Sequence, residues 1–197
     1  MVANRGGRPR DPRIESAVLK ATAQLLVKHG YTDLSVDDIA ARAKTTKPAI
    51  YRRWKSKARL VHEAAFPLEV VDIGTRPDAE ARSLADDVRD MVEGAAIVMG
   101  SPVARAALPG LIGEFQNDPN LHTLVLERFQ TGPLVWAAQR LDRAIADGEA
   151  RPGADLSTIV TLIGGAMFFR LLVETGQPCD EAWIDRITDH ILQGVLP

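Results

Sequence analysis

Apolar residues recur at helical spacing along most of this chain, and no segment shows the apolar–polar alternation that is typical of a strand. One stripe, between Ile14 and Leu25, places an apolar residue every three or four positions, and Gly30 follows where such a helix would end. Glycine and proline divide the rest of the chain into similar stretches. The pattern predicts an all-α protein.

Charge is divided unevenly along the chain. Residues 1–60 contain 14 basic and 5 acidic residues, and the remainder contains 10 basic and 21 acidic residues, although the net charge of the whole is only −2. Every lysine lies at or before Lys57. A basic end on an otherwise acidic protein favours contact with a polyanion such as nucleic acid. A solvated charged surface without a partner is the alternative.

Composition argues against several other classes of protein. The one cysteine, Cys179, cannot form an internal disulfide, and no Cys/His spacing suits zinc, so we expect a reducing, cytoplasmic compartment with no metal or cofactor. No secretory signal is recognisable, and no apolar run reaches the ~18–20 residues that span a membrane. The four histidines are scattered, and no nucleophile elbow or phosphate-binding loop occurs, so the sequence predicts that the protein is not an enzyme.

Two short helices joined by a tight turn are predicted within residues 34–54. The first follows Ser35, a suitable N-cap, and has an apolar face that can pack against the body of the protein. The second is capped by Thr46 or the threonine before it, carries proline in its first turn, and turns Ile50 and Trp54 inward. Its other residues are mostly basic or hydroxyl-bearing, which is what a helix-turn-helix needs to present donors to the major groove of DNA.

This segment resembles the signature of the TetR family of transcriptional regulators. Residues 34–61 have the sequence LSVDDIAARAKTTKPAIYRRWKSKARLV, in which a short helix, a turn, a recognition helix ending in Tyr-x-x-aromatic and a Ser-Lys pair opening the next helix follow at the family's spacing. The resemblance is strong over residues 13–62 and weaker over residues 168–192, FFRLLVETGQPCDEAWIDRITDHIL. It implies an N-terminal three-helix helix-turn-helix DNA-binding domain and a larger C-terminal helical domain for ligand binding and dimerisation.

Four positions depart from the family pattern. Lys44 stands where a glycine is common in the turn, and a residue with a Cβ tolerates positive φ less well there. Thr45 replaces a small apolar residue, Trp54 a phenylalanine and Arg53 a histidine. Arg53 is thereby an additional candidate for a groove or phosphate contact.

The resemblance implies two kinds of DNA contact. Base edges are recognised by side chains such as arginine or lysine, which bond guanine O6 and N7, and alanine, which touches the thymine methyl; the residues expected there are Lys47, Pro48, Ala49 and Arg52. Phosphate contacts position a domain without reading sequence, and the residues expected there are Ser35, Thr46, Tyr51 and Lys57. The alternatives are that Tyr51 packs within the helix bundle and that Lys47 and Lys57 are solvated charges.

Residues 1–12 are rich in Gly, Pro and Arg and are expected to form a flexible basic arm. Arg8 and Arg10 on this arm are candidates for following the phosphate backbone or entering an adjacent minor groove. A disordered tail that aids solubility is the alternative, and the sequence favours neither.

The last two predicted helices carry more apolar surface than one bundle contact needs. The resemblance implies that they pair with their copies in a four-helix homodimer interface, and the residues expected there are Ile163, Met167, Phe168, Leu171, Trp183, Ile187 and Ile191. A dimer would present two recognition helices to a palindromic operator. Packing within a single internal core is the alternative.

The resemblance also implies an effector pocket within residues 78–150. Large or adaptable side chains are available to line it, namely Met91, Met99, Phe115, Phe129 and Trp136. For each of them ordinary core packing is the alternative. Few charges fall among these faces, which favours a hydrophobic ligand, and nothing distinguishes the polar candidates Arg105, Glu114 and Arg140.

Two helix boundaries in the second half follow from capping and proline. Asp78 suits the N-cap of a helix that runs to about Met99. The next helix opens at Ser101-Pro102, and the Pro109-Gly110 pair is expected to kink or end it.

The chain is therefore divided into a flexible basic arm (1–12), a helix-turn-helix DNA-binding domain (13–60) and an effector-binding and dimerisation domain (61–197). The function predicted is a TetR-type repressor that a small hydrophobic ligand releases from a palindromic double-stranded DNA operator. An architectural DNA-binding protein without a ligand signal is the main alternative, and the helical region of over a hundred residues argues against it. An activator also fits the sequence.

Overall fold

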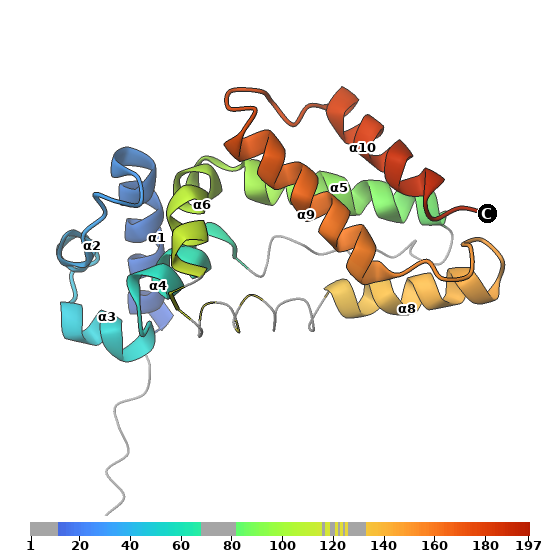
Figure 1. Ribbon diagram of the computed structural model, residues 1–197. Helices are drawn as coiled ribbons and strands as arrows, with labels where there is room; N and C mark the ends of the chain where they lie inside the picture. The colour runs from blue at the N-terminus through green and yellow to red at the C-terminus, as the bar shows by residue number, and fades with distance from the viewer. Residues whose placement is uncertain are drawn as a thin grey trace, which may run out of the picture.

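The structure is a computed structural model that describes residues 12–67, 82–115 and 133–197, together with five positions between 117 and 125. Every regular element in these residues is a helix (Figure 1). The helices are α1 (Pro12–His29), α2 (Val36–Arg42), α3 (Lys47–Arg53), α4 (Lys57–Ala65), α5 (Leu84–Gly100), α6 (Pro102–Phe115), α8 (Pro133–Ala146), α9 (Leu156–Leu172) and α10 (Glu181–Gln193). The prediction of an all-α fold is confirmed.

Hydroxyl N-caps start the three short helices α2, α3 and α4. The side-chain oxygens of Ser35, Thr46 and Ser56 each accept a hydrogen bond from a backbone N–H of the first turn, at 3.1, 3.3 and 3.2 Å. Each cap satisfies a donor that the helix itself cannot pair and is worth about 0.5–2 kcal/mol. These caps set the points at which the three helices begin, as the sequence predicted.

The turn between α2 and α3 is a Schellman motif. The N–H of Lys44 donates to the carbonyl of Ala41 at 3.3 Å, and the N–H of Thr45 donates to the carbonyl of Ala40 at 2.9 Å. Lys44 has a φ of 53°, a left-handed conformation that glycine adopts without strain and that costs another residue about 1–2 kcal/mol. Lysine at this position therefore leaves the geometry of the turn intact and makes it strained.

The first hydrophobic core joins α1, α2, α3 and α4 at one end of the molecule (Figure 1). Leu26, Ile39, Ile50 and Leu60 are at most 2% exposed, and Trp54 is 4% exposed. Full burial of an aliphatic side chain of this size contributes about 1.5–3 kcal/mol. The prediction that Ile50 and Trp54 face inward is confirmed.

The second core lies between α5, α8, α9 and α10, with α5 in contact with all of the others. Met167 and Val92 are fully buried in it. Helix α5 begins at Leu84 and is capped by Ser83, which forms a reciprocal capping box with the carboxylate of Asp86. The expected cap Asp78 lies outside the described residues.

Helix α6 packs into both cores. Ala107 and Leu111 belong to the first core and Leu108 to the second. Ser101 alone separates α6 from α5, and the two helices meet at 81°. A displacement of α5 would therefore be carried directly to the first core.

The expectation that Pro109-Gly110 ends the helix is wrong, because α6 continues through both residues to Phe115. Tertiary packing explains the continuity. Gly110 lies against the ring of Tyr31, so closely that an added Cβ would come within 2.1 Å of the ring atom Cδ1. The packing of α6 on α1 and α4 thus favours a helix that continues past the proline.

We expect Lys44→Gly to stabilise the protein by about 0.5–1 kcal/mol, because the relief of left-handed strain exceeds the extra chain entropy that glycine loses on folding. Thermal unfolding measures the change. Lys55→Gly is the matched control, since Lys55 has no positive φ and its loss removes the same charge. A lower melting temperature for Lys44→Gly than for the unmodified protein would contradict the strain.

Candidate functional site

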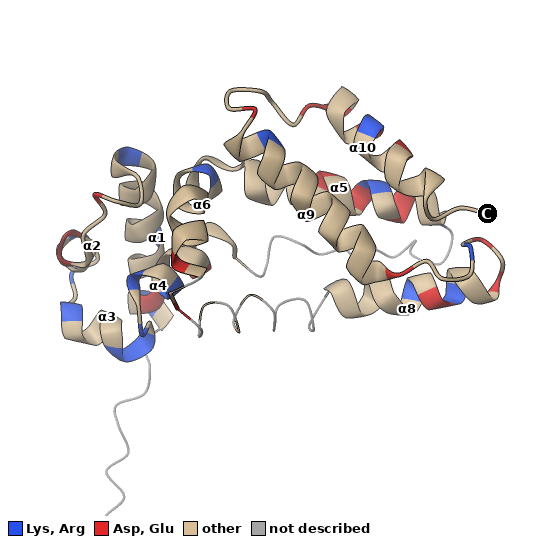
Figure 2. Ribbon diagram, in the orientation of Figure 1, with Lys and Arg blue, Asp and Glu red and all other residues tan. Residues whose placement is uncertain are grey.

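Helix α3 turns one side into the first core and the other toward solvent. Ile50 is buried, whereas Lys47, Pro48, Tyr51 and Arg52 are exposed. Figure 2 shows basic residues at both ends of α3, at the outer end of the molecule, and acidic residues mainly on the helices of the second core. An exposed basic helix with a buried apolar side is the arrangement that fits a major groove about 12 Å wide.

Two cations of α3 form ion pairs with acids on neighbouring helices. The Nζ of Lys47 lies 2.8 Å from Oδ2 of Asp37 on α2, and this hydrogen bond, with the charge of the carboxylate, raises the pKa of Lys47. Arg53 pairs with Glu15 on α1. In the part of the chain that the structure describes, Arg52 makes no ion pair or hydrogen bond. Carboxylates therefore offset the charges of Lys47 and Arg53, whereas no acid in the described residues pairs with Arg52.

The other predicted DNA contacts occupy two kinds of position. Thr46 is exposed at the start of α3 and Ala49 is half-buried, while Ser35 is half-buried at the start of α2. Lys57 is half-buried, and its Nζ donates to the backbone carbonyls of Tyr31 and Leu34 at 2.8 and 3.2 Å. In this conformation Lys57 holds the connection between α1 and α2 to the start of α4. The predicted residues Arg8 and Arg10 lie outside the described residues.

A polar joint connects the helix-turn-helix to α6. The ring of Tyr31 lies under the Lys57 ammonium at 4.4 Å and against Gly110. Burial, followed by the charge and hydrogen bond of Glu114 on α6, raises the pKa of the Tyr31 hydroxyl. The hydroxyl of Ser56 donates to Asp118 at 2.9 Å. These contacts attach the base of the DNA-binding end to the helix that enters both cores.

A small cavity of about 20 Å³, with room for about one water molecule, lies between α5, α8 and α9. Its walls are mainly apolar, and they include Met91 and Trp136 from the predicted effector set. Met99 packs in the second core and Phe115 against the first, and neither lines the cavity. Phe129 lies outside the described residues.

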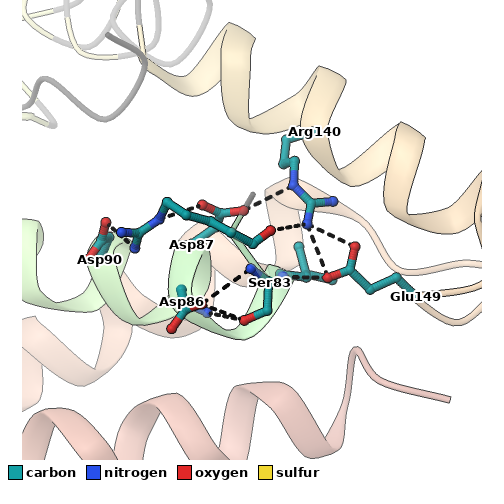
Figure 3. Close-up of polar contacts among 8 residues, drawn as sticks. Ser83, Asp86, Asp87, Asp90, Arg140 and Glu149 are labelled. Carbon is teal, nitrogen blue, oxygen red and sulfur yellow. Dashed lines mark hydrogen bonds and ion pairs between the residues drawn. The ribbon is translucent and has the colours of Figure 1, made fainter. Parts of the chain in front are cut away.

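Two charged residues lie in the cavity wall, of which the sequence offered Arg140 as one of three undistinguished candidates and missed Asp87. Arg140 of α8 and Asp87 of α5 are 8% and 5% exposed, and Arg140 Nε lies 3.0 Å from Asp87 Oδ2. Figure 3 shows the same guanidinium bonded to Glu149, at 2.8 and 3.0 Å from its two carboxylate oxygens. Burial raises the pKa of the Asp87 carboxyl, despite the two arginines beside it, Arg140 and Arg82. Arg140 was among the polar candidates, but its partners lie 53 residues before it and 9 after, which no spacing rule identifies.

Most residues predicted for a dimer interface lie inside the single chain. Five are buried in the second core, namely Ile163, Met167, Leu171, Trp183 and Ile191, and Phe168 and Ile187 are half-buried. The apolar residues that α9 exposes are Leu162, Phe169 and Val173, at 51%, 56% and 64%. These three positions recur at helical spacing and share the side of α9 that faces away from the core. We call them the α9 face.

No group of three or more His, Cys, Asp or Glu side chains in the described residues is placed to hold a metal ion. None of their helices alone is long and apolar enough to cross a membrane; α5 and α6 meet that measure only as a pair, which is sharply bent.

Helix α3 is exposed and basic, and it packs on α2 as the second helix of a pair joined by a tight turn. This arrangement defines a helix-turn-helix DNA-binding protein with an attached helical domain. Comparison with known families supports the same class. Residues 18–64 match the model described as bacterial regulatory proteins, tetR family, and residues 78–191 match the model described as tetracyclin repressor-like, C-terminal domain. The chain belongs to the TetR family, whose members are transcriptional regulators that bind DNA and not enzymes.

Individual relatives agree with this assignment over nearly the whole chain. The HTH-type transcriptional regulator YdeS of Bacillus subtilis is 31% identical over 191 residues, which cover 96% of this chain and 93% of that protein. The DNA-binding transcriptional repressor TetR of Mycobacteroides abscessus is 30% identical, with 90% of each chain covered. The crystal structure of the TetR family transcription regulator SCO0332 superimposes with a TM-score of 0.67 at 27% identity, covering 94% of this chain and 100% of that one.

Proposed function

We propose that this protein is a repressor that binds a palindromic operator as a homodimer and leaves it when a small hydrophobic ligand binds. The observation that carries the proposal is the division of α3 into a buried apolar side and an exposed basic side. A relative that matches 90% of this chain is named a DNA-binding transcriptional repressor, which favours repression over activation.

In this proposal α3 lies in the major groove. Lys47 and Arg52 hydrogen-bond base edges, with Pro48 and Ala49 in apolar contact beside them. The hydroxyl groups of Ser35, Thr46 and Tyr51, with the cations of Arg53 and Lys57, contact phosphates on either side. Lys57 contacts its phosphate from the base of the helix-turn-helix, where its ammonium also bonds two backbone carbonyls.

The proposed dimer forms through the α9 face. Helix α9 is apolar on all sides, and a helix of this kind is normally buried on all sides. The second core covers one side, through Ile163 and Met167, and leaves Leu162, Phe169 and Val173 to solvent in the single chain. A second copy placed against this face would bury them by an isologous contact, and α9 and α10 of both copies would form a four-helix interface.

The cavity between α5, α8 and α9 is the proposed effector site. As it stands the cavity holds about one water molecule, so a ligand enters only when α5 and α8 move apart; its walls are mostly apolar, with Arg140 as a polar group that can orient a ligand. A ligand that displaces α5 also displaces α6, because only Ser101 separates them, and α6 contacts α1 and α4. A coupling of about 1–3 kcal/mol between the two sites is enough to change operator occupancy 5- to 150-fold.

We expect Lys47→Ala to change sequence preference. After the operator is defined by footprinting and in vitro selection, its binding should weaken by about 1–3 kcal/mol, and discrimination at one base position per half-site should be lost. Fluorescence anisotropy with operator and single-base variants measures both effects. Lys55→Ala removes an exposed charge beyond α3 and should reduce binding to all duplexes alike. Equal losses on operator and unrelated DNA for Lys47→Ala would rule out a base contact.

We expect Phe169→Glu to dissociate the dimer, because the substitution places a charge in an apolar interface while the side chain is 56% exposed in the single chain. Sedimentation should show a monomer of normal helical content. The control, Ser157→Glu, introduces the same charge at an exposed position on another side of α9 and should remain dimeric. A Phe169→Glu dimer as stable as the unmodified one would place the interface elsewhere.

We expect Ala137→Phe to uncouple the protein from its ligand by filling the cavity, at a stability cost of about 1–3 kcal/mol. Apolar compounds that release the operator are first found by screening. The variant should bind the operator normally and need far more of those compounds for release. Ala146→Phe, at an exposed position of the same helix, should respond like the unmodified protein. An unchanged response of Ala137→Phe would show that the ligand binds at another place.

A further inference from the structure

The ion pair between Lys47 and Asp37 places an acid on the surface that would face DNA. Asp37 lies in the first turn of α2, where its backbone N–H donates to the Ser35 hydroxyl, so its position is fixed by the cap. Its carboxylate is 67% exposed and bonds the ammonium of Lys47, the first residue of α3, at 2.8 Å. An acid at this place lowers the affinity of the surface for a polyanion.

We propose that Asp37 is a specificity-determining residue that lowers the affinity for arbitrary DNA by holding Lys47 in an ion pair. The inference rests on the proposed function in one respect, that α3 enters the major groove. Asp37 acts through Lys47 and is a positioning residue; no contact between Asp37 and DNA is needed.

The physical reason lies in how arbitrary duplexes are bound. Non-specific affinity comes from cations that neutralise phosphates and release condensed counterions, with a slope of about −0.9 in log K against log salt for each phosphate neutralised. A lysine that Asp37 already neutralises contacts no phosphate and releases no counterion. At the operator, Lys47 exchanges the carboxylate for acceptors on a base, and giving up an exposed ion pair costs at most about fivefold in the binding constant. A duplex of arbitrary sequence does not place base acceptors where Lys47 could exchange the carboxylate for them.

The pairing is selective among the neighbouring charges. Asp38, the next residue of α2, is also exposed, and in the described part of the chain it forms no ion pair. Arg52, on the same exposed side of α3, has no acidic partner among the described residues. Asp37 therefore acts on one cation of the recognition helix, and Asp38 provides a control of equal charge, one position away.

The test uses the full chain and a 30-base-pair duplex of unrelated sequence. We expect Asp37→Asn to bind this duplex up to about fivefold more tightly per DNA-binding domain at 0.1 M salt, and its salt slope to steepen by up to about 0.9 per domain. Asp38→Asn should change both quantities much less, because it alters the net charge equally without releasing Lys47. Circular dichroism melting checks that both variants fold alike.

A double-mutant cycle with Lys47→Ala identifies the route. In the Lys47→Ala background, Asp37→Asn should no longer steepen the salt slope, and on the selected operator Asp37→Asn should gain less than on unrelated DNA. Equal effects of Asp37→Asn and Asp38→Asn, or an Asp37→Asn effect that persists without Lys47, would overturn the inference. Absence of salt-dependent binding by the unmodified protein to any duplex would instead overturn the proposed function.

Discussion

The position of α3 depends on the burial of two side chains. A helix of seven residues is too short to be stable alone in water. Ile50 and Trp54 supply what the helix lacks, because both are buried in the first core, while the three residues between them are exposed. Trp54 is fixed further by a hydrogen bond from its indole N–H to Glu63 at 2.9 Å. The exposed cations of α3 are thereby held on a rigid base instead of on a loop.

Burial of side chains also determines how the two cores are connected. Helix α6 contributes Ala107 and Leu111 to one core and Leu108 to the other, so a packed helix joins the two cores. Asp87, in the cavity wall, lies in the first turn of α5, whose opposite end leads into α6. The packed helices α5 and α6 thus form a short connection from the cavity wall to the first core.

The sequence predicted what depends on local rules and missed what depends on distant pairing. The cap at Ser35 and a threonine cap for α3 follow from residue type and spacing alone, as does the inward side of α3. The helix end expected at Pro109 was wrong, because packing on Tyr31 outweighs the local preference of proline.

Two features of the candidate sites were beyond sequence reasoning for different reasons. Helix α9 is apolar all round, so periodicity cannot say which side meets the protein's own core, and Ile163 and Met167 proved to be buried there. The pairs Asp87–Arg140 and Asp37–Lys47 join separate helices, and nothing in the spacing of either pair marks it.

The contact between Gly110 and Tyr31 constrains how this protein can vary through evolution. Any side chain at position 110 would overlap the ring, so the smallest replacement, alanine, is admissible only after position 31 has become smaller. Changing Tyr31 first removes the ring that Lys57 covers. The two positions must therefore change in a fixed order. A lineage that loses this contact must acquire a smaller residue at position 31, just after α1, before it acquires a larger one at position 110 of α6.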